Sequence, residues 1–207
     1  LAFAVNSCLQ QMGRPPYPQA VIRNWIGNGI ETLIHRALTG DEDGKADENQ
    51  YDQAFTLFLQ AYEENNGKYS QVYQGVIPAL NQLQQLSIRM GVVTNKRGRF
   101  SEPLLADKQL LPYFDLIVSG DTLPQKKPHP APLKYAAEYF SAKPELSIMV
   151  GDSKNDIEAG RSQGFEIFRR HMSESYQVMP GMSHSTSQVL VVLSQSRGYS
   201  HNSHRTL

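Results

Sequence analysis

The sequence predicts an α/β protein in which a doubly wound parallel sheet, a Rossmann-like core, follows a small all-helical domain. Two observations carry this prediction. From about residue 75, short apolar stretches alternate with helical patterns, which is typical of crossover units in a parallel sheet covered on both faces. Before that point, apolar residues recur only at helical spacing. We therefore expect a helical domain at residues 1–74, the α/β core at 75–168 and a tail of atypical composition at 169–207.

The N-terminal part contains four stretches with an apolar face. The first ends at Gly13 and the turn-forming "RPPYP", and the second begins at Pro18, which suits the first position of a helix. The stretch "WIGNG" interrupts the helical pattern, and the acidic "TGDEDGKADENQ" is typical of a solvated loop. The helical stretches lie near residues 1–12, 18–26, 30–38 and 54–62.

The α/β part contains four apolar stretches of strand length, separated by helical patterns. The predicted strands are residues 89–95, 115–121, 146–152 and 165–168, and the predicted helices are 77–87, 101–110, 131–140 and 155–164.

The tail after Phe168 does not continue this alternation. Its stretch "SQVLVVL", residues 187–193, fits either a strand or a short helix, and the remainder has a disordered composition. His201 and His204 have a metal-like spacing, which we interpret as incidental because isolated short motifs of this kind are weak indicators.

Charge and cysteine content exclude several classes of function. Lys plus Arg and Asp plus Glu are both 20, so no net field attracts nucleic acid or an anionic membrane, and an anion needs a local site. No apolar run approaches the roughly 20 residues that span a bilayer, and no signal peptide is visible. The single Cys8 rules out an internal disulfide. We expect a cytoplasmic protein with neither nucleic acid nor membrane as partner.

Polar residues follow the predicted strands and converge, because the carboxyl ends of parallel strands meet at one edge of a sheet. The stretch "VVTN" ends in Thr94 and Asn95, "KKPHP" contains Lys127, and "MVGDSKND" contains Asp152 and Asp156. A hydroxyl and a neighbouring backbone N–H can hold a phosphoryl oxygen, while an ammonium neutralises its charge. Paired carboxylates at a strand end suit Mg²⁺, which also binds phosphate.

Each of these residues also has an ordinary structural explanation. Thr94 alone fits a strand end, Lys127 a solvated loop, and Asp152 the cap of the following helix. A further strand end, "IVSGD", offers Ser119 and Asp121, which do not fit the same set. The order and strand-end placement of the first three groups favour a phosphate site.

These motifs resemble those of the haloacid dehalogenase superfamily phosphatases. The stretches that carry the resemblance are "VVTNK", "GDTLPQKKPHPAPL" and "VGDSKNDIEAG", with "WIGNG" in the helical part, and it extends to about Phe168. The resemblance implies that the helical domain is a cap and that the activity is hydrolysis of a small phosphorylated metabolite. It further implies Mg²⁺ as cofactor, an aspartyl-phosphate intermediate, and a monomer or homodimer.

The resemblance also implies roles for individual residues. Thr94 and the Asn95 N–H would bind phosphoryl oxygens, and Lys127 would stabilise the charge that develops on them. Asp152 would bind Mg²⁺, and Asp156 would either hold the waters of the metal or orient Lys127.

The resemblance also implies that a loop of the cap recognises the substrate. Gly27, Asn28 and Gly29 are the candidates for it. A simple helix break explains "GNG" equally well, and both interpretations stay open.

The first motif of the family has no counterpart in this sequence. That motif, Asp-x-Asp-Gly-Thr on a central strand, holds the nucleophilic aspartate and would lie just before Leu1. Asp41, Asp43 and Gly44 match it superficially, but no apolar strand precedes them and we interpret them as loop. We therefore expect the chain by itself to be unable to form the aspartyl-phosphate intermediate.

Four alternatives follow from the same residues. A phosphomutase of the same superfamily shares every motif seen here and differs in converting a sugar phosphate to its isomer. A dehalogenase is disfavoured because paired metal ligands have no role in halide displacement, and a two-component receiver domain because of the helical first third. A non-catalytic remnant or binding subunit stays open, because the nucleophile motif is absent.

Overall fold

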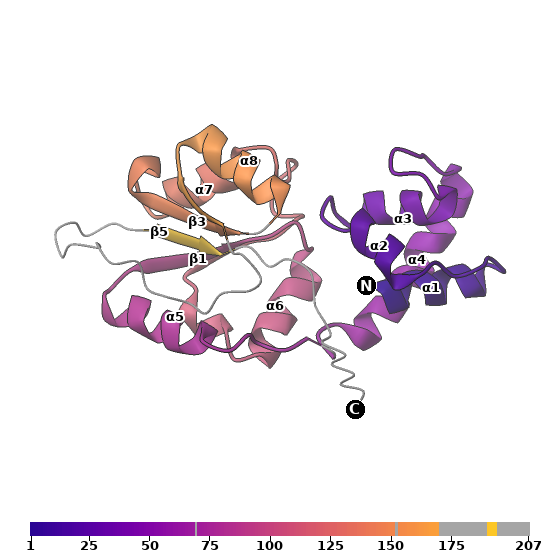
Figure 1. The fold of residues 1–207 in the computed structure, drawn as a ribbon, viewed down its shortest axis with the longest axis horizontal. Coiled ribbons are helices and arrows are strands. Elements are labelled where there is room, and N and C mark those ends of the chain that lie inside the picture. The colour runs from indigo at the N-terminus through magenta and orange to yellow at the C-terminus, as the bar shows by residue number, and fades with distance from the viewer. Residues whose placement is uncertain (69, 152, 170–189, 194–207) are drawn as a thin grey trace, which may run out of the picture. The chain divides into compact units, whose positions relative to one another are not determined.

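The chain folds into two compact units, one helical and one α/β. The computed structural model describes residues 1–68, 70–151, 153–169 and 190–193, and Figure 1 shows its ribbon. The helical unit contains residues 1–26 and 31–71, and the α/β unit contains residues 27–30 together with the described part of the chain from Val72 onward. The short segment 27–30 thus belongs to the α/β unit, although helical residues flank it in sequence.

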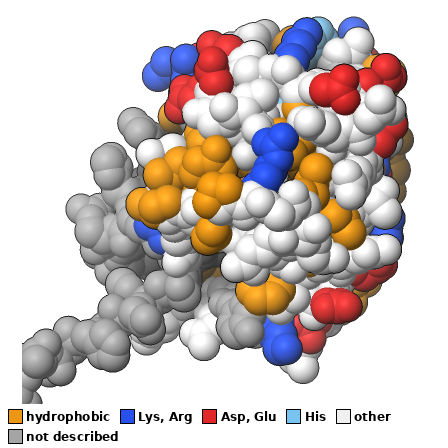
Figure 2. Space-filling model, turned by 90° about the vertical axis from the view of Figure 1, so that its right-hand side faces the viewer, with side chains coloured by type: hydrophobic (Ala, Val, Ile, Leu, Met, Phe, Trp, Pro, Cys, Tyr) orange, Lys and Arg blue, Asp and Glu red, His pale blue; other side chains and the backbone are white. Residues whose placement is uncertain are grey.

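Charged side chains of both signs are mixed on the face of the molecule shown in Figure 2. This mixture agrees with the equal numbers of basic and acidic residues, 20 each. On this face the charges form no single-sign field of the kind that attracts polyanions.

None of the helices in the described part of the chain is long and apolar enough to span a bilayer.

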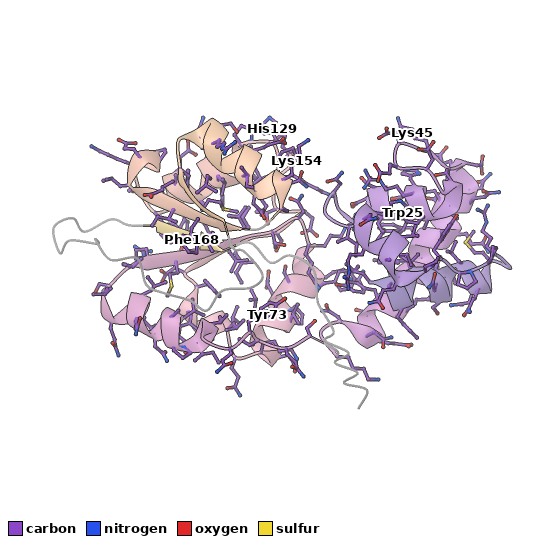
Figure 3. The ribbon with its side chains drawn as sticks, viewed as in Figure 1. Trp25, Lys45, Tyr73, His129, Lys154 and Phe168 are labelled. Atoms are coloured by element: carbon purple, nitrogen blue, oxygen red, sulfur yellow. The ribbon has the colours of Figure 1, made fainter. Side chains whose placement is uncertain are left out.

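The helical unit confirms the predicted helices and corrects the start of the fourth. The elements are α1 (Ala2–Gln11), α2 (Gln19–Trp25), α3 (Ile30–Thr39) and α4 (Glu48–Asn65). Helix α4 begins inside the stretch predicted as loop, because the Asp47 side chain accepts hydrogen bonds from the N–H groups of Asn49 and Gln50 and caps it. Trp25 is buried in this unit, whereas Lys45 lies exposed on a loop (Figure 3).

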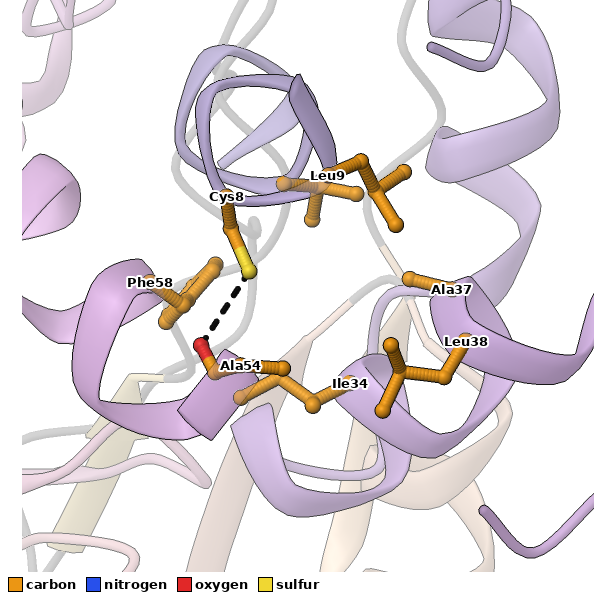
Figure 4. A pocket seen from close by; sticks show the side chains of 8 residues that line it. Cys8, Leu9, Ile34, Ala37, Leu38, Ala54 and Phe58 are labelled. Atoms are coloured by element: carbon orange, nitrogen blue, oxygen red, sulfur yellow. Dashed lines mark hydrogen bonds between the residues drawn. The ribbon is translucent and has the colours of Figure 1, made fainter. Parts of the chain in front are cut away.

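The core of the helical unit encloses a small apolar cavity (Figure 4). Its volume is about 10 Å³, room for roughly one water molecule, and its lining offers no polar side chain other than the thiol of Cys8. The Cys8 Sγ–H donates to the carbonyl oxygen of Ala54 at 3.2 Å. The cavity is therefore a packing defect and not a ligand site. Burial raises the pKa of Cys8 to about 11.

We expect Cys8 to resist alkylation in the folded chain. With a pKa of about 11 in place of 9.0, the thiolate fraction at pH 8.5 falls by about two orders of magnitude, and helices α1 and α4 also block access. The measurement is the rate of iodoacetamide labelling, followed by mass spectrometry, in buffer and in concentrated urea. Equal rates in the two solvents would contradict this account of the core.

In the part of the chain that the structure describes, the α/β unit is built on a five-stranded sheet in which all neighbouring strands are parallel. The strands lie in the order β2-β1-β5-β3-β4. Their bounds are Arg89–Val93 (β1), Leu116–Val118 (β2), Ser147–Gly151 (β3), Glu166–Arg169 (β4) and Leu190–Leu193 (β5).

Helices cover both faces of this sheet (Figure 1). They are α5 (Val76–Gln85), α6 (Gly98–Asp107), α7 (Ala131–Tyr139) and α8 (Lys154–Gln163), with short 3₁₀ turns η1 (Leu111–Tyr113) and η2 (Pro144–Leu146). Helices α7 and α8 lie on one face and α5 and α6 on the other. Met149 packs with α7 and α8 while its neighbour Val150 packs with the α5 cluster, as alternation along a strand requires. The predicted doubly wound sheet is confirmed.

The tail supplies the central strand of the sheet. The sequence left residues 187–193 open between strand and helix, and the backbone of Leu190–Leu193 forms β5 between β1 and β3. Leu190 is in register with Arg89 on one side and with Ser147 on the other. Four apolar residues in a row suit a strand that is paired on both edges. His201 and His204 lie outside the described residues.

Candidate active site

The site is built where strands β1 and β3 end and where α8 begins. Both strands run in the same direction, so the residues that follow them lie at the same edge of the sheet. Thr94 directly follows β1 and is 4% exposed. Its backbone N–H donates to Val118 O of β2 at 2.9 Å, which fixes the chain at the point where β1 ends.

A buried ion pair joins Lys127 to Asp156. Lys127 Nζ lies 2.7 Å from Asp156 Oδ1, and each side chain is 2% exposed. The same ammonium donates to the backbone carbonyl of Val93 at 2.5 Å. Because Val93 immediately precedes Thr94, these contacts place the Lys127 ammonium and the Asp156 carboxylate at the end of β1. Lys154 and His129, by contrast, are exposed on the surface of the α/β unit (Figure 3).

The start of α8 holds the second oxygen of Asp156. Ser153 is the N-cap, and both its backbone N–H, at 3.1 Å, and its hydroxyl, at 2.7 Å, donate to Asp156 Oδ2. The N-terminus of the helix adds its own partial positive charge beside this carboxylate. Gly151 is required here, because a Cβ at this position would lie 2.6 Å from the Asp156 side chain.

These contacts favour one of the two roles considered for Asp156. Oδ1 accepts from Lys127 and Oδ2 from Ser153, so both carboxylate oxygens are engaged by protein donors. This is the arrangement expected of a residue that orients Lys127. Direct binding of a metal ion by Asp156 stays a prediction.

The magnesium site rests on Asp152, which lies outside the described residues. Within residues 1–68, 70–151, 153–169 and 190–193, no three His, Cys, Asp or Glu side chains come close enough to share a metal ion. The donor chemistry of a carboxylate at a strand end suits Mg²⁺. The residues that the structure describes do not by themselves complete this site.

Asn95 connects three segments of the site. Its Nδ2 donates to the carbonyl of Lys127 at 2.8 Å and to that of Gly27 at 3.0 Å. Its Oδ1 accepts the backbone N–H of Lys127 at 3.0 Å. The side chain therefore fixes the backbone from which Lys127 projects, a role additional to the predicted contribution of the Asn95 N–H.

The hydroxyl of Thr94 is oriented by the turn that follows it. Thr94 Oγ1 accepts the backbone N–H of Lys96 at 3.1 Å, so its own proton remains to be donated to a further acceptor. Partial burial lowers the pKa of the Lys96 ammonium to about 8. A second cation whose charge is sensitive to pH therefore lies two residues from Thr94.

Ser119 and Asp121 have structural roles, which agrees with their exclusion from the predicted set. The Ser119 hydroxyl is 2.8 Å from that of Ser101 in α6, and both are buried. Asp121 Oδ1 accepts the N–H of Gly98 at 2.8 Å and so stabilises the start of α6.

Gly27 and Asn28 are brought to the same place, and Asn155, which the sequence did not single out, holds them. Asn155 Nδ2 donates to Gly27 O at 3.0 Å and to Asn28 Oδ1 at 2.9 Å. Ser153 is the other residue that sequence reasoning missed, although its spacing to Asp156 is that of a capping box.

Fold and strand-end chemistry together define an α/β enzyme suited to phosphoryl groups. The chain belongs to the haloacid dehalogenase-like hydrolase family, whose model matches residues 1–169. It is 42% identical over 167 residues to the phosphoglycolate phosphatase of Nitrosococcus oceani, covering 81% of this chain and 74% of that protein. Identity to the enzyme of the same name from Nitrosospira multiformis is 43% over 168 residues, with the same coverage.

A solved structure shares the fold. A crystal structure described as a predicted phosphoglycolate phosphatase from Haemophilus somnus superposes with a TM-score of 0.77 at 29% identity, covering 91% of this chain and 85% of that one. The resemblance seen in the sequence is thus confirmed, and so is the expectation of a phosphatase-type hydrolase.

We expect Lys127→Met to destabilise the chain strongly. The change leaves the Asp156 carboxylate buried without its cation, which costs about 3–5 kcal/mol in the free energy of unfolding. The measurement is urea unfolding followed by circular dichroism. Lys134→Met is the matched control, because its ion pair with Glu138 is exposed and contributes about 0.5 kcal/mol or less. Equal effects of the two changes would contradict the importance of the buried pair.

Proposed function

We propose that this chain provides the helical and α/β parts of a phosphatase that hydrolyses a small phosphate monoester, with 2-phosphoglycolate as the first candidate. The observation that carries the proposal is the Lys127 ammonium, held by Asp156 and by the Val93 carbonyl directly beside Thr94. The relatives named phosphoglycolate phosphatase support the choice of substrate.

In this proposal, the described residues bind and neutralise the phosphoryl group. Thr94 donates its hydroxyl proton, and Asn95 its backbone N–H, to phosphoryl oxygens. Lys127 places a positive charge next to the same oxygens. Asp156 and Asn95 do not touch the substrate through their side chains but hold the ammonium and the backbone of Lys127 in position. This preorganisation removes the need to reorient charges as the reaction proceeds.

Mg²⁺ is the proposed cofactor, with Asp152 as its protein ligand. When bound, a divalent cation supplies positive charge that polarises the phosphoryl group. The nucleophilic aspartate of aspartyl-phosphate chemistry has no match among the residues of this chain. We propose that turnover requires an Asp-x-Asp-Gly-Thr strand in addition to these residues.

Gly27, Asn28 and Gly29 are proposed to recognise the part of the substrate that is not phosphate. Asn28 is exposed, and its neighbour Gly27 is bonded to Asn95, which also holds Lys127. The recognition segment and the phosphate-binding lysine therefore share one connecting side chain. The cytoplasmic location and the monomeric or homodimeric state stay predictions.

The test is release of inorganic phosphate from 2-phosphoglycolate in the presence of Mg²⁺. A form that carries an Asp-x-Asp-Gly-Thr strand ahead of Leu1 is expected to be active, and the chain without that strand inactive. Metal-dependent turnover by the chain alone would overturn the assignment of the nucleophile. Absence of turnover by both forms with any phosphate monoester would overturn the phosphatase proposal.

In the active form, Lys127→Ala is expected to lower kcat by about two to three orders of magnitude, since removing one preorganised charge partner costs about 3–4 kcal/mol in the transition state. Lys134→Ala, on the exposed face of α7, is the control and should leave kcat unchanged. A loss below tenfold for Lys127→Ala would contradict its role.

A further inference from the structure

Two asparagine side chains converge on one backbone carbonyl of the segment Gly27–Gly29. Asn95 Nδ2 and Asn155 Nδ2 each lie 3.0 Å from Gly27 O. Asn95 follows β1, and Asn155 lies in the first turn of α8. A carbonyl oxygen accepts two hydrogen bonds, so the two amides use its full capacity.

Asn155 also fixes the side chain next to this carbonyl. Its amide carries two N–H donors, and besides Gly27 O it contacts Asn28 Oδ1 at 2.9 Å. Asn28 is exposed, and an exposed asparagine ordinarily samples several rotamers. The bond from Asn155 restricts the Asn28 amide, because it fixes the amide oxygen against the first turn of α8.

The backbone of the segment needs such support. Gly27 has φ +134° and Gly29 has φ +93°, conformations that L side chains rarely adopt. Two glycines that flank one residue give a freely moving loop unless other contacts hold it. The two asparagine amides supply those contacts, and they originate from the same strand-end region that holds Lys127.

We propose that Asn155 is a positioning residue for substrate recognition: it holds Gly27 and Asn28 against the α/β unit, so that Asn28 meets the non-phosphate part of the substrate already ordered. This inference rests on the proposed function of the segment. Ordering the segment before binding removes an entropic cost of recognition. Asn95 also binds the Gly27 carbonyl, but it holds Lys127 as well, so its loss would affect phosphate binding too. Loss of Asn155 would affect only recognition of the non-phosphate part of the substrate.

The first measurement is backbone hydrogen exchange of residues 26–33 in the full chain, read by mass spectrometry. Asn155→Ala removes both donors, and Asn155→Asp replaces the NH₂ group with an oxygen that faces Gly27 O and Asn28 Oδ1. Both variants are expected to speed exchange in this segment by about tenfold or more, because local opening becomes easier. An aspartate in the first turn of α8 favours the helix, so Asn155→Asp keeps the fold.

A matched asparagine provides the control. Asn65 Nδ2 donates to Ala61 O at 2.9 Å within α4, so Asn65→Ala also removes an amide donor to a carbonyl. Exchange of residues 26–33 is expected to be the same in this variant as in the unchanged chain.

The second measurement is calorimetric binding of two ligands in the presence of Mg²⁺. Asn155→Ala, which adds no charge to the site, is expected to weaken binding of 2-phosphoglycolate by about tenfold while inorganic phosphate changes by less than about twofold. A purely structural role of Asn155 would weaken both ligands alike, because it would disturb the phosphate site through α8.

Each outcome decides one part of the inference. If backbone hydrogen exchange of residues 26–33 is unchanged in both Asn155 variants, Asn155 does not hold the segment and the inference is overturned. If exchange is faster but the affinities for 2-phosphoglycolate and inorganic phosphate fall equally, or do not fall, the recognition role is overturned. If the unchanged chain binds neither ligand, the proposed function fails for this chain and the recognition role with it, while the exchange result still decides whether Asn155 holds the segment.

Discussion

The buried ion pair between Lys127 and Asp156 is the interaction on which the site depends. Removing two charges from water is costly, and the cost is offset only when each charge has good partners. Here the ammonium has the carboxylate and the Val93 carbonyl, and the carboxylate has in addition the N–H and hydroxyl of Ser153. The pair thereby links the end of β1, the segment before α7 and the first turn of α8.

This link gives the site its rigidity. Lys127 is held at both ends, because its side chain is bound by Asp156 and its backbone by the amide of Asn95. A long, flexible side chain ordinarily loses much conformational entropy when it binds a ligand. In this arrangement that loss has already occurred on folding, so the ammonium is in place before any ligand binds.

The sheet was predictable from sequence because it follows from simple periodicity. Alternation of apolar runs with helical patterns indicates a parallel sheet, and the residues that follow its strands, such as Thr94, lie at one edge of it. Asn155 was not predictable, since its partner Gly27 is 128 residues away and no sequence pattern marks an amide that meets a carbonyl. The start of α4 was missed because the Asp47 cap lies in a run of acidic residues that also suits a loop. The run 190–193 was ambiguous, as four apolar residues are too few to show a period.

The position of β5 bears on how the sheet is assembled. Arg89 of β1 pairs with Leu190 of β5, and on the other edge β5 pairs with β3, so the middle of the sheet is contributed by a segment that follows both of its neighbours in the chain. Until that segment is in place, β1 and β3 expose unpaired edges, and such edges favour association with other chains. Partnerships across so long a stretch of chain also form slowly. The two halves of the sheet, β2-β1 and β3-β4, therefore stay unjoined until β5, the last of these strands in chain order, takes its place between them.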